Sequence, residues 1–79
     1  MAIRRRPQLV ISFATTTAAM AAEAYFKEQG LPGRIIPLPR EVSAGCGLSW
    51  KADLADEATL TEVLDVAGIA FSGVHHVTI

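Results

Sequence analysis

The residue with the clearest chemical potential is Cys46, the single cysteine of this 79-residue chain. It stands between Gly45 and Gly47, so no neighbouring side chain shields the thiol, and the backbone can adopt the positive φ that converges N–H groups on an anion. A thiolate held in this way is a nucleophile. The alternative is that the thiol serves as a small buried hydrophobe in a glycine-rich turn, and the residues leave both interpretations open.

The surroundings of this cysteine favour a negative charge. It lies in the connection Pro39–Gly47, which is longer than a hairpin needs for turning alone. Arg40 supplies a cation within this connection, and Thr15 and Thr16 stand where a helix is expected to begin, at the positive end of its dipole. We therefore expect these three residues, with the two glycines, to form an anion-binding site that lowers the pKa of the thiol.

Other kinds of chemistry find little support. His75 and His76 are adjacent on a predicted strand, so they face opposite sides and cannot share one metal ion. With no second cysteine, a thioredoxin-type oxidoreductase is disfavoured. No phosphate loop, dinucleotide fingerprint or pair of catalytic carboxylates appears. Seven basic and eight acidic residues give a net charge of −1, which implies no nucleic-acid partner.

The N-terminal segment imitates a signal peptide without matching one well. Three arginines, residues 4–6, precede an apolar run from Leu9 to Ala22, but three threonines interrupt that run. The run is also too short and too polar for a membrane helix. We expect residues 1–8 to be a basic tail, and a lone cysteine indicates a reducing compartment, so the expected location is the cytoplasm, with no membrane partner.

Hydrophobic periodicity predicts six elements in the remainder, residues 9–79. A helix running from the threonines to Gly30 carries its apolar side at Ala18, Ala22, Tyr25, Phe26 and Gln29. A second helix has apolar residues at Leu60, Val63, Leu64 and Ala67, starts with a capping box at Thr59 or with Asp56, and stops at Gly68. The predicted strands are Leu9–Phe13, Arg34–Leu38, Leu48–Lys51 and Val74–Ile79.

The order β-α-β-β-α-β predicts an α+β ferredoxin-like sandwich, in which two helices cover one face of a four-stranded antiparallel sheet. Right-handed crossovers then bring the start of the first helix and the Pro39–Gly47 connection to the same end of the sheet. The covered face is expected to carry Ile11, Phe13 and Leu48. The opposite face is expected to carry Val10, Ser12, Ser49 and Lys51, and to remain open for a homodimer or another partner.

Four segments of the chain resemble the putative selenium/sulfur carrier protein-like family over residues 9 to 79. They are the strand ending in Phe13, the threonine-rich helix start followed by Glu23, the stretch 36–40 and the stretch 42–48. The most specific matching residues are Pro39, Arg40, Ser43, Cys46 and Gly47. The resemblance implies a carrier that holds sulfane sulfur or selenium on Cys46 as a persulfide or perselenide, with donor and acceptor proteins as partners and no resident cofactor. It adds Ser43 to the expected anion- or chalcogen-binding residues.

Two functions of different class follow. The first is the chalcogen carrier, which needs no general acid and is closer to a binding protein than to an enzyme with turnover. The second is a regulatory or assembly module in which the Pro39–Gly47 loop binds a small anion or a protein partner and Cys46 is incidental. A reactive thiol with a lowered pKa favours the carrier, whereas an inert, shielded thiol favours the module.

Overall fold

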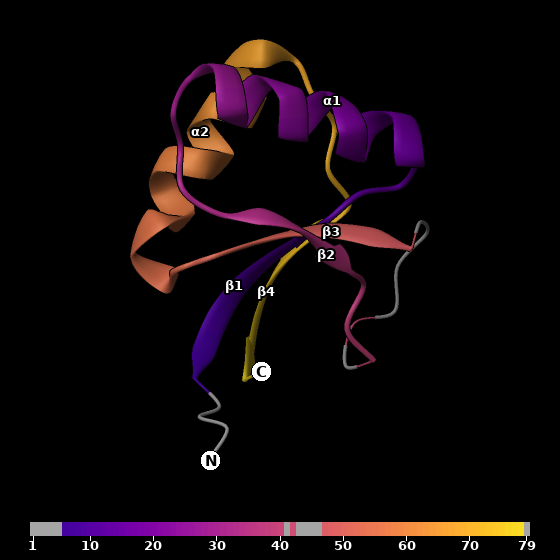
Figure 1. Cartoon of the computed structure of the whole chain (residues 1–79), viewed down its shortest axis with the longest axis vertical. Coiled ribbons are helices and arrows are strands. Elements are labelled where there is room, and N and C mark those ends of the chain that lie inside the picture. Colours follow the sequence, from indigo (N-terminus) through magenta and orange to yellow (C-terminus); the bar gives the residue numbers. More distant parts are fainter. Residues whose placement is uncertain (1–5, 41, 43–46, 79) are drawn as a thin grey trace.

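The computed structural model describes residues 6–40, 42 and 47–78 of the chain. Two helices, α1 and α2, lie against the same side of a twisted sheet of four strands (Figure 1). In chain order the elements are β1 (Pro7–Ser12), α1 (Thr16–Glu28), β2 (Arg34–Pro37), β3 (Leu48–Ala52), a short 3₁₀ helix (Leu54–Asp56), α2 (Glu57–Ala67) and β4 (Gly73–Thr78). This is the β-α-β-β-α-β order that the sequence predicted.

The strands lie in the order β2-β3-β1-β4, and each neighbouring pair is antiparallel. The α+β ferredoxin-like prediction is thereby confirmed. β2 is an edge strand, as expected from Pro37, because proline has no N–H for a further ladder. The pairs Ser12↔Ser49 and Pro37↔Leu48 bring the ends of β1 and β2 and the start of β3 together. We call this the loop end of the sheet, because the Pro39–Gly47 connection leaves from it.

β1 begins at Pro7, two residues before the expected start at Leu9. Pro7 and Gln8 pair with Thr78 and Val77 of β4. Both residues, which the sequence predicts to lie in the tail, are thus part of the sheet. The hydrophobic alternation that starts at Leu9 gave no sign of this, because the partner strand decides where a ladder ends.

α1 begins where a threonine caps it. Oγ1 of Thr15 accepts a hydrogen bond from the backbone N–H of Ala18, at 3.1 Å, which satisfies one of the free donors of the first turn. The helix ends just before Gly30, whose φ of 68° is the left-handed conformation typical of a helix C-terminus. Gln29, which the sequence predicts on the apolar side, is the C-cap of the helix and is exposed. The buried residues of α1 are Ala19, Ala22 and Phe26.

α2 starts at Glu57, directly after the 3₁₀ helix, with Asp56 as its N-cap. The alternative start at Thr59 is therefore wrong, since that residue lies inside the first turns. Gly68 ends the helix with a φ of 72°, as predicted. Leu60 and Leu64 are its buried residues. In the part of the chain that the structure describes, neither helix is long and apolar enough to cross a membrane.

The main core lies between the helices and the sheet. Its largest member, Trp50 of β3, packs against Phe26 of α1, with 4.8 Å between the ring centroids. The other fully or almost fully buried members are Leu9, Ile11, Phe13, Ala19, Ala22, Ala52, Leu60 and Leu64. Leu48 is half-buried against this cluster. The predicted helix-covered face is thereby confirmed.

The other face of the sheet, which we call the second face, carries a smaller cluster. Val10 and Val77 are buried there beneath Val42 of the connection, and Leu38 packs at the side. Ser12 and Ser49 are also buried on this face. The expectation of an open second face is therefore wrong at Val10 and Val77, because Val42 of the connection covers them. A homodimer through this face stays a prediction.

Candidate functional site

The base of the Pro39–Gly47 connection is closed by one backbone hydrogen bond. The N–H of Leu38 donates to the carbonyl oxygen of Gly47 at 2.9 Å, one step beyond the last residues paired between β2 and β3. Gly47 itself is exposed. The predicted site residues Ser43, Gly45 and Cys46 lie outside the described residues. What the structure provides is the position of the two strands that carry this connection.

A second anchor holds the connection at Val42. This side chain is 6% exposed and packs on Val10 and Val77, and its N–H donates to the carbonyl oxygen of Pro39 at 3.0 Å. Val10 belongs to β1 and Val77 to β4, the far edge strand, so Val42 lies over these two strands. The sequence does not predict that Val42 is buried, because a single valine among loop residues shows no periodicity. The only available signal was a β-branched apolar residue in an otherwise polar and glycine-rich stretch.

The threonines at the start of α1 lie at the same end of the sheet as Gly47, as predicted from the topology. Thr15 uses a lone pair of its hydroxyl oxygen for the cap, which leaves its O–H free to donate elsewhere. Thr16 is exposed in the first turn. With no acidic side chain in that turn, the partial positive charge of the helix N-terminus is not neutralised by its own residues.

Arg40 is exposed at the loop end. Among the described residues it has no ion-pair partner, since the ion pairs there are Glu23 with Lys27 and Glu57 with His76. Among the described residues, Thr15, Thr16 and Gly47 lie at the loop end, and Arg40 stands in the connection, two residues after Leu38.

The two histidines of β4 face opposite sides, as predicted. Nε2 of His75 lies 3.0 Å from Oγ of Ser12 on the second face, whereas Nε2 of His76 lies 2.5 Å from Oε1 of Glu57 on the helix side. Within the described residues, no three potential ligands gather as a metal site would require. The Ser12–His75 pair was not foreseen, because only the β1–β4 register brings these residues together. Ser12 is buried, so this pair joins β1 to β4 and offers no exposed nucleophile.

Comparison with known proteins gives one positive result. The model of the family described as "Putative Se/S carrier protein-like" matches residues 8–76. This range includes both anchors of the connection and the connection itself. No curated protein and no solved structure matches the chain.

Proposed function

The chain belongs to the putative Se/S carrier protein-like family, and from this premise we propose that it carries sulfur or selenium on Cys46. The match covers residues 8–76, and the chain has one cysteine to hold such a cargo. This family match is the observation that carries the proposal. The donor and the acceptor of the chalcogen are then partner proteins, and a reducing cytoplasm is the proposed compartment.

The transfer is an exchange between sulfur atoms without net oxidation. The thiolate of Cys46 attacks the terminal sulfur of a donor persulfide, R–S–SH. A new S–S bond forms to Cys46, the old S–S bond breaks, and its electron pair leaves with the donor as R–S⁻. An acceptor thiolate then attacks the terminal sulfur held on Cys46. The S–S bond to Cys46 breaks, and Cys46 leaves as the thiolate. Selenium follows the same balance with R–S–SeH as donor.

Two features of the described residues support a thiolate at this position. The N-terminus of α1, capped by Thr15 and without acidic residues in its first turn, lies at the loop end. Arg40 adds a cation there that is not engaged by any described carboxylate. Both would favour the charged form of a nearby thiol and so lower its pKa. In this proposal Gly45, Gly47, Ser43, Thr15, Thr16 and Arg40 serve as the groups that stabilise the terminal anion.

Val42 gives the carrier a fixed base. Because this residue is buried against Val10 and Val77, the connection is tied to the sheet four residues before Cys46 and again at Gly47 directly after it. A carrier benefits from such anchoring, since a donor and an acceptor must each find the cargo at the same place. The alternative module, with a loop that binds an anion or a partner, would use the same anchors but not the thiol.

Mass spectrometry of protein purified without reductant tests the proposal. A carrier loaded in the cell shows an added mass of about 32 for sulfur or about 80 for selenium, which reductant removes. In Cys46→Ser the added mass is absent while the thermal unfolding curve is unchanged. If incubation with a persulfide donor also leaves Cys46 unmodified, the carrier function is excluded and the anion- or partner-binding module takes its place.

A further inference from the structure

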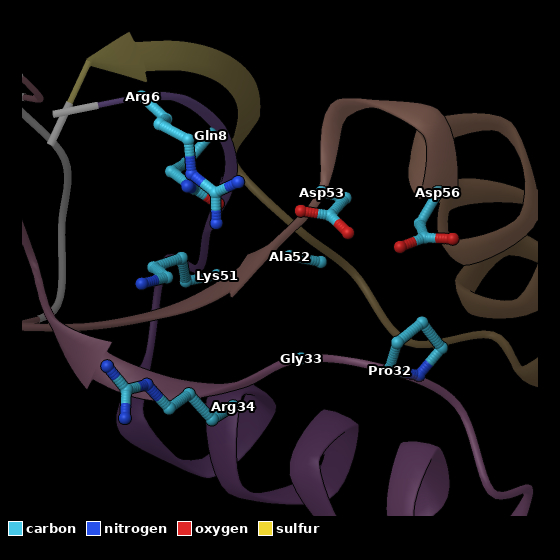
Figure 2. A pocket seen from close by; sticks show the side chains of 9 residues that line it. All are labelled: Arg6, Gln8, Pro32, Gly33, Arg34, Lys51, Ala52, Asp53 and Asp56. Carbon is cyan, nitrogen blue, oxygen red and sulfur yellow. The ribbon is translucent and has the colours of Figure 1, made fainter. Parts of the chain in front are cut away.

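A hollow of about 330 Å³ opens at the end of the sheet opposite the loop end, where β1 and β2 begin and β3 finishes (Figure 2). It is built from segments far apart in the sequence that the sheet register joins, as in the pair Arg34↔Lys51. The polar side chains that line it are Arg6, Gln8, Arg34, Lys51, Asp53 and Asp56. None of them belongs to the cysteine-bearing connection.

Three of these side chains are cations that pair with no carboxylate of a described residue. In the chain from residue 6 to 78, as far as it is described, Arg6, Arg34 and Lys51 form no ion pair. Arg34 and Lys51 are directly opposite each other on β2 and β3. Like charges in that position repel each other and destabilise a sheet. An anion placed between them would convert this repulsion into attraction.

Gln8 adds a neutral polar group to the lining of the hollow. The residue is 8% exposed, and its side-chain amide makes no hydrogen bond with any residue that the structure describes. Since no buried side-chain N or O atom among the described residues lacks a partner, this amide reaches the open space of the hollow. The side chain lines the hollow and lies behind that of Arg6 (Figure 2). Its NH₂ group is thus placed to donate to a molecule bound there.

The wall on the other side is acidic. Neither Asp53 nor Asp56 caps the helix that follows it with its side chain. Figure 2 shows both carboxylates across the hollow from Lys51 and Arg34. Carboxylates accept hydrogen bonds from hydroxyl groups. The lining therefore suits a molecule with an oxyanion at one end and hydroxyl groups at the other, rather than a bare polyanion.

We infer that this hollow binds a small sugar phosphate, with its phosphate on Arg6, Arg34, Lys51 and Gln8 and its hydroxyls on Asp53 and Asp56. A phosphate near pH 7 carries about −1.5 to −2 charges, and three cations are enough to neutralise it. Arginine and lysine are the side chains that recognise phosphate best. The proposed ligand contacts include no residue of the Pro39–Gly47 connection, so the test of this site is separate from the test of the carrier function.

Titration calorimetry of the full chain tests this inference with ribose 5-phosphate, inorganic phosphate and ribose as probes. We expect saturable binding of ribose 5-phosphate, weaker binding of inorganic phosphate, no binding of ribose, and a loss of affinity with added NaCl. Arg34→Ala and Lys51→Ala should each weaken the binding of ribose 5-phosphate by about tenfold or more. Lys27→Ala, which removes the same charge from α1, should change it by less than about twofold.

A further variant separates the two walls. Asp53→Asn should weaken the binding of ribose 5-phosphate but not the binding of inorganic phosphate, because only the sugar hydroxyls contact the acidic side of the hollow. The proposed site would be excluded if Lys27→Ala and Lys51→Ala lost the same affinity for ribose 5-phosphate, or if no phosphate bound saturably. Sedimentation with phosphatidylglycerol vesicles distinguishes a lipid headgroup, which also offers phosphate and hydroxyls. Binding to vesicles without binding of the soluble probes would contradict the assignment to a soluble sugar phosphate.

Discussion

The indole Nε1 of Trp50 donates a hydrogen bond to the carbonyl oxygen of Pro32 at 3.2 Å. This contact ties the start of β2 to the centre of the main core, and it draws the backbone of the next residue, Gly33, against the indole. A Cβ at Gly33 would lie 2.4 Å from that Nε1 and 2.5 Å from the carbonyl oxygen of Lys51. The largest core side chain and the wall of the polar hollow therefore depend on the same glycine.

Gly33→Ala should destabilise the protein strongly. The residue has a φ of 115°, a backbone conformation that residues with a side chain rarely adopt. The added methyl group would also overlap the backbone of Lys51 and the indole of Trp50. We expect a loss of about 3 kcal/mol or more in the free energy of unfolding. Urea unfolding measures it. Gly30→Ala is the matched control, since its φ is 68° but no atom lies within 4 Å of the added Cβ. The expected cost of Gly30→Ala in the free energy of unfolding is about 1 kcal/mol. An equal cost for both variants would show that the close contacts of Gly33 do not affect stability.

Leu64→Ala should leave a cavity in the main core. Leu64 is fully buried on α2, together with Leu60, and the loss of its side chain should cost about 2 to 4 kcal/mol. This is a large part of the stability of a small domain. The measurement is the midpoint of urea unfolding relative to the unchanged chain. A cost below about 0.5 kcal/mol would contradict the burial of this side chain.

The two faces of the sheet could be predicted from sequence, but the start of α2 could not. Alternation along β1 correctly separated Ile11 and Phe13 from Val10 and Ser12, because the side-chain period of a strand is fixed at two residues. Asp56 and Thr59 are both residue types that favour a helix N-cap, so the sequence leaves the start of α2 open between them. In the structure the 3₁₀ helix Leu54–Asp56 leads directly into α2, which makes Asp56 the N-cap.

Non-local features of the site escaped prediction for a different reason. The hollow brings together Arg6, Arg34 and Lys51, which are unremarkable singly and become neighbours only through the register of three strands. The burial of Val42 could likewise not be predicted, because its partners Val10 and Val77 lie on two strands that are distant from it in the sequence. Local sequence patterns predict elements and their faces, whereas the contacts between loops and distant strands need the completed sheet.

Val42→Ala tests whether the connection is held on the second face. The side chain is 6% exposed, so its truncation should cost about 1 to 2 kcal/mol in the free energy of unfolding. Val66→Ala is the control on a valine that is 79% exposed, and it should change stability by less than about 0.5 kcal/mol. Thermal or urea unfolding of both variants gives the comparison. If the two substitutions have the same effect, Val42 does not anchor the connection.

The pH profile of Cys46 alkylation tests the proposed carrier chemistry most directly. If the N-terminus of α1 and Arg40 stabilise the thiolate, the pKa of Cys46 lies below the ordinary value of about 8.5. Arg40→Ala and Thr15→Ala should then each raise this pKa by up to about one unit, because each removes a favourable interaction of about 1 kcal/mol with the charged form. A higher pKa leaves less thiolate at pH 7, so alkylation there should slow by up to about tenfold, while the rate above pH 10 stays the same.

Two controls make this profile specific. Thr15→Ser keeps an oxygen that can accept the bond from the N–H of Ala18, so it should restore the helix cap and most of the lowered pKa of Cys46. Lys27→Ala removes a positive charge from the far part of α1, where Glu23 pairs with it, and should leave the profile unchanged. If Arg40→Ala and Thr15→Ala also leave the profile unchanged, neither group acts on the thiol. A thiol that reacts only after unfolding would make Cys46 structural, and the connection would then serve as a binding loop.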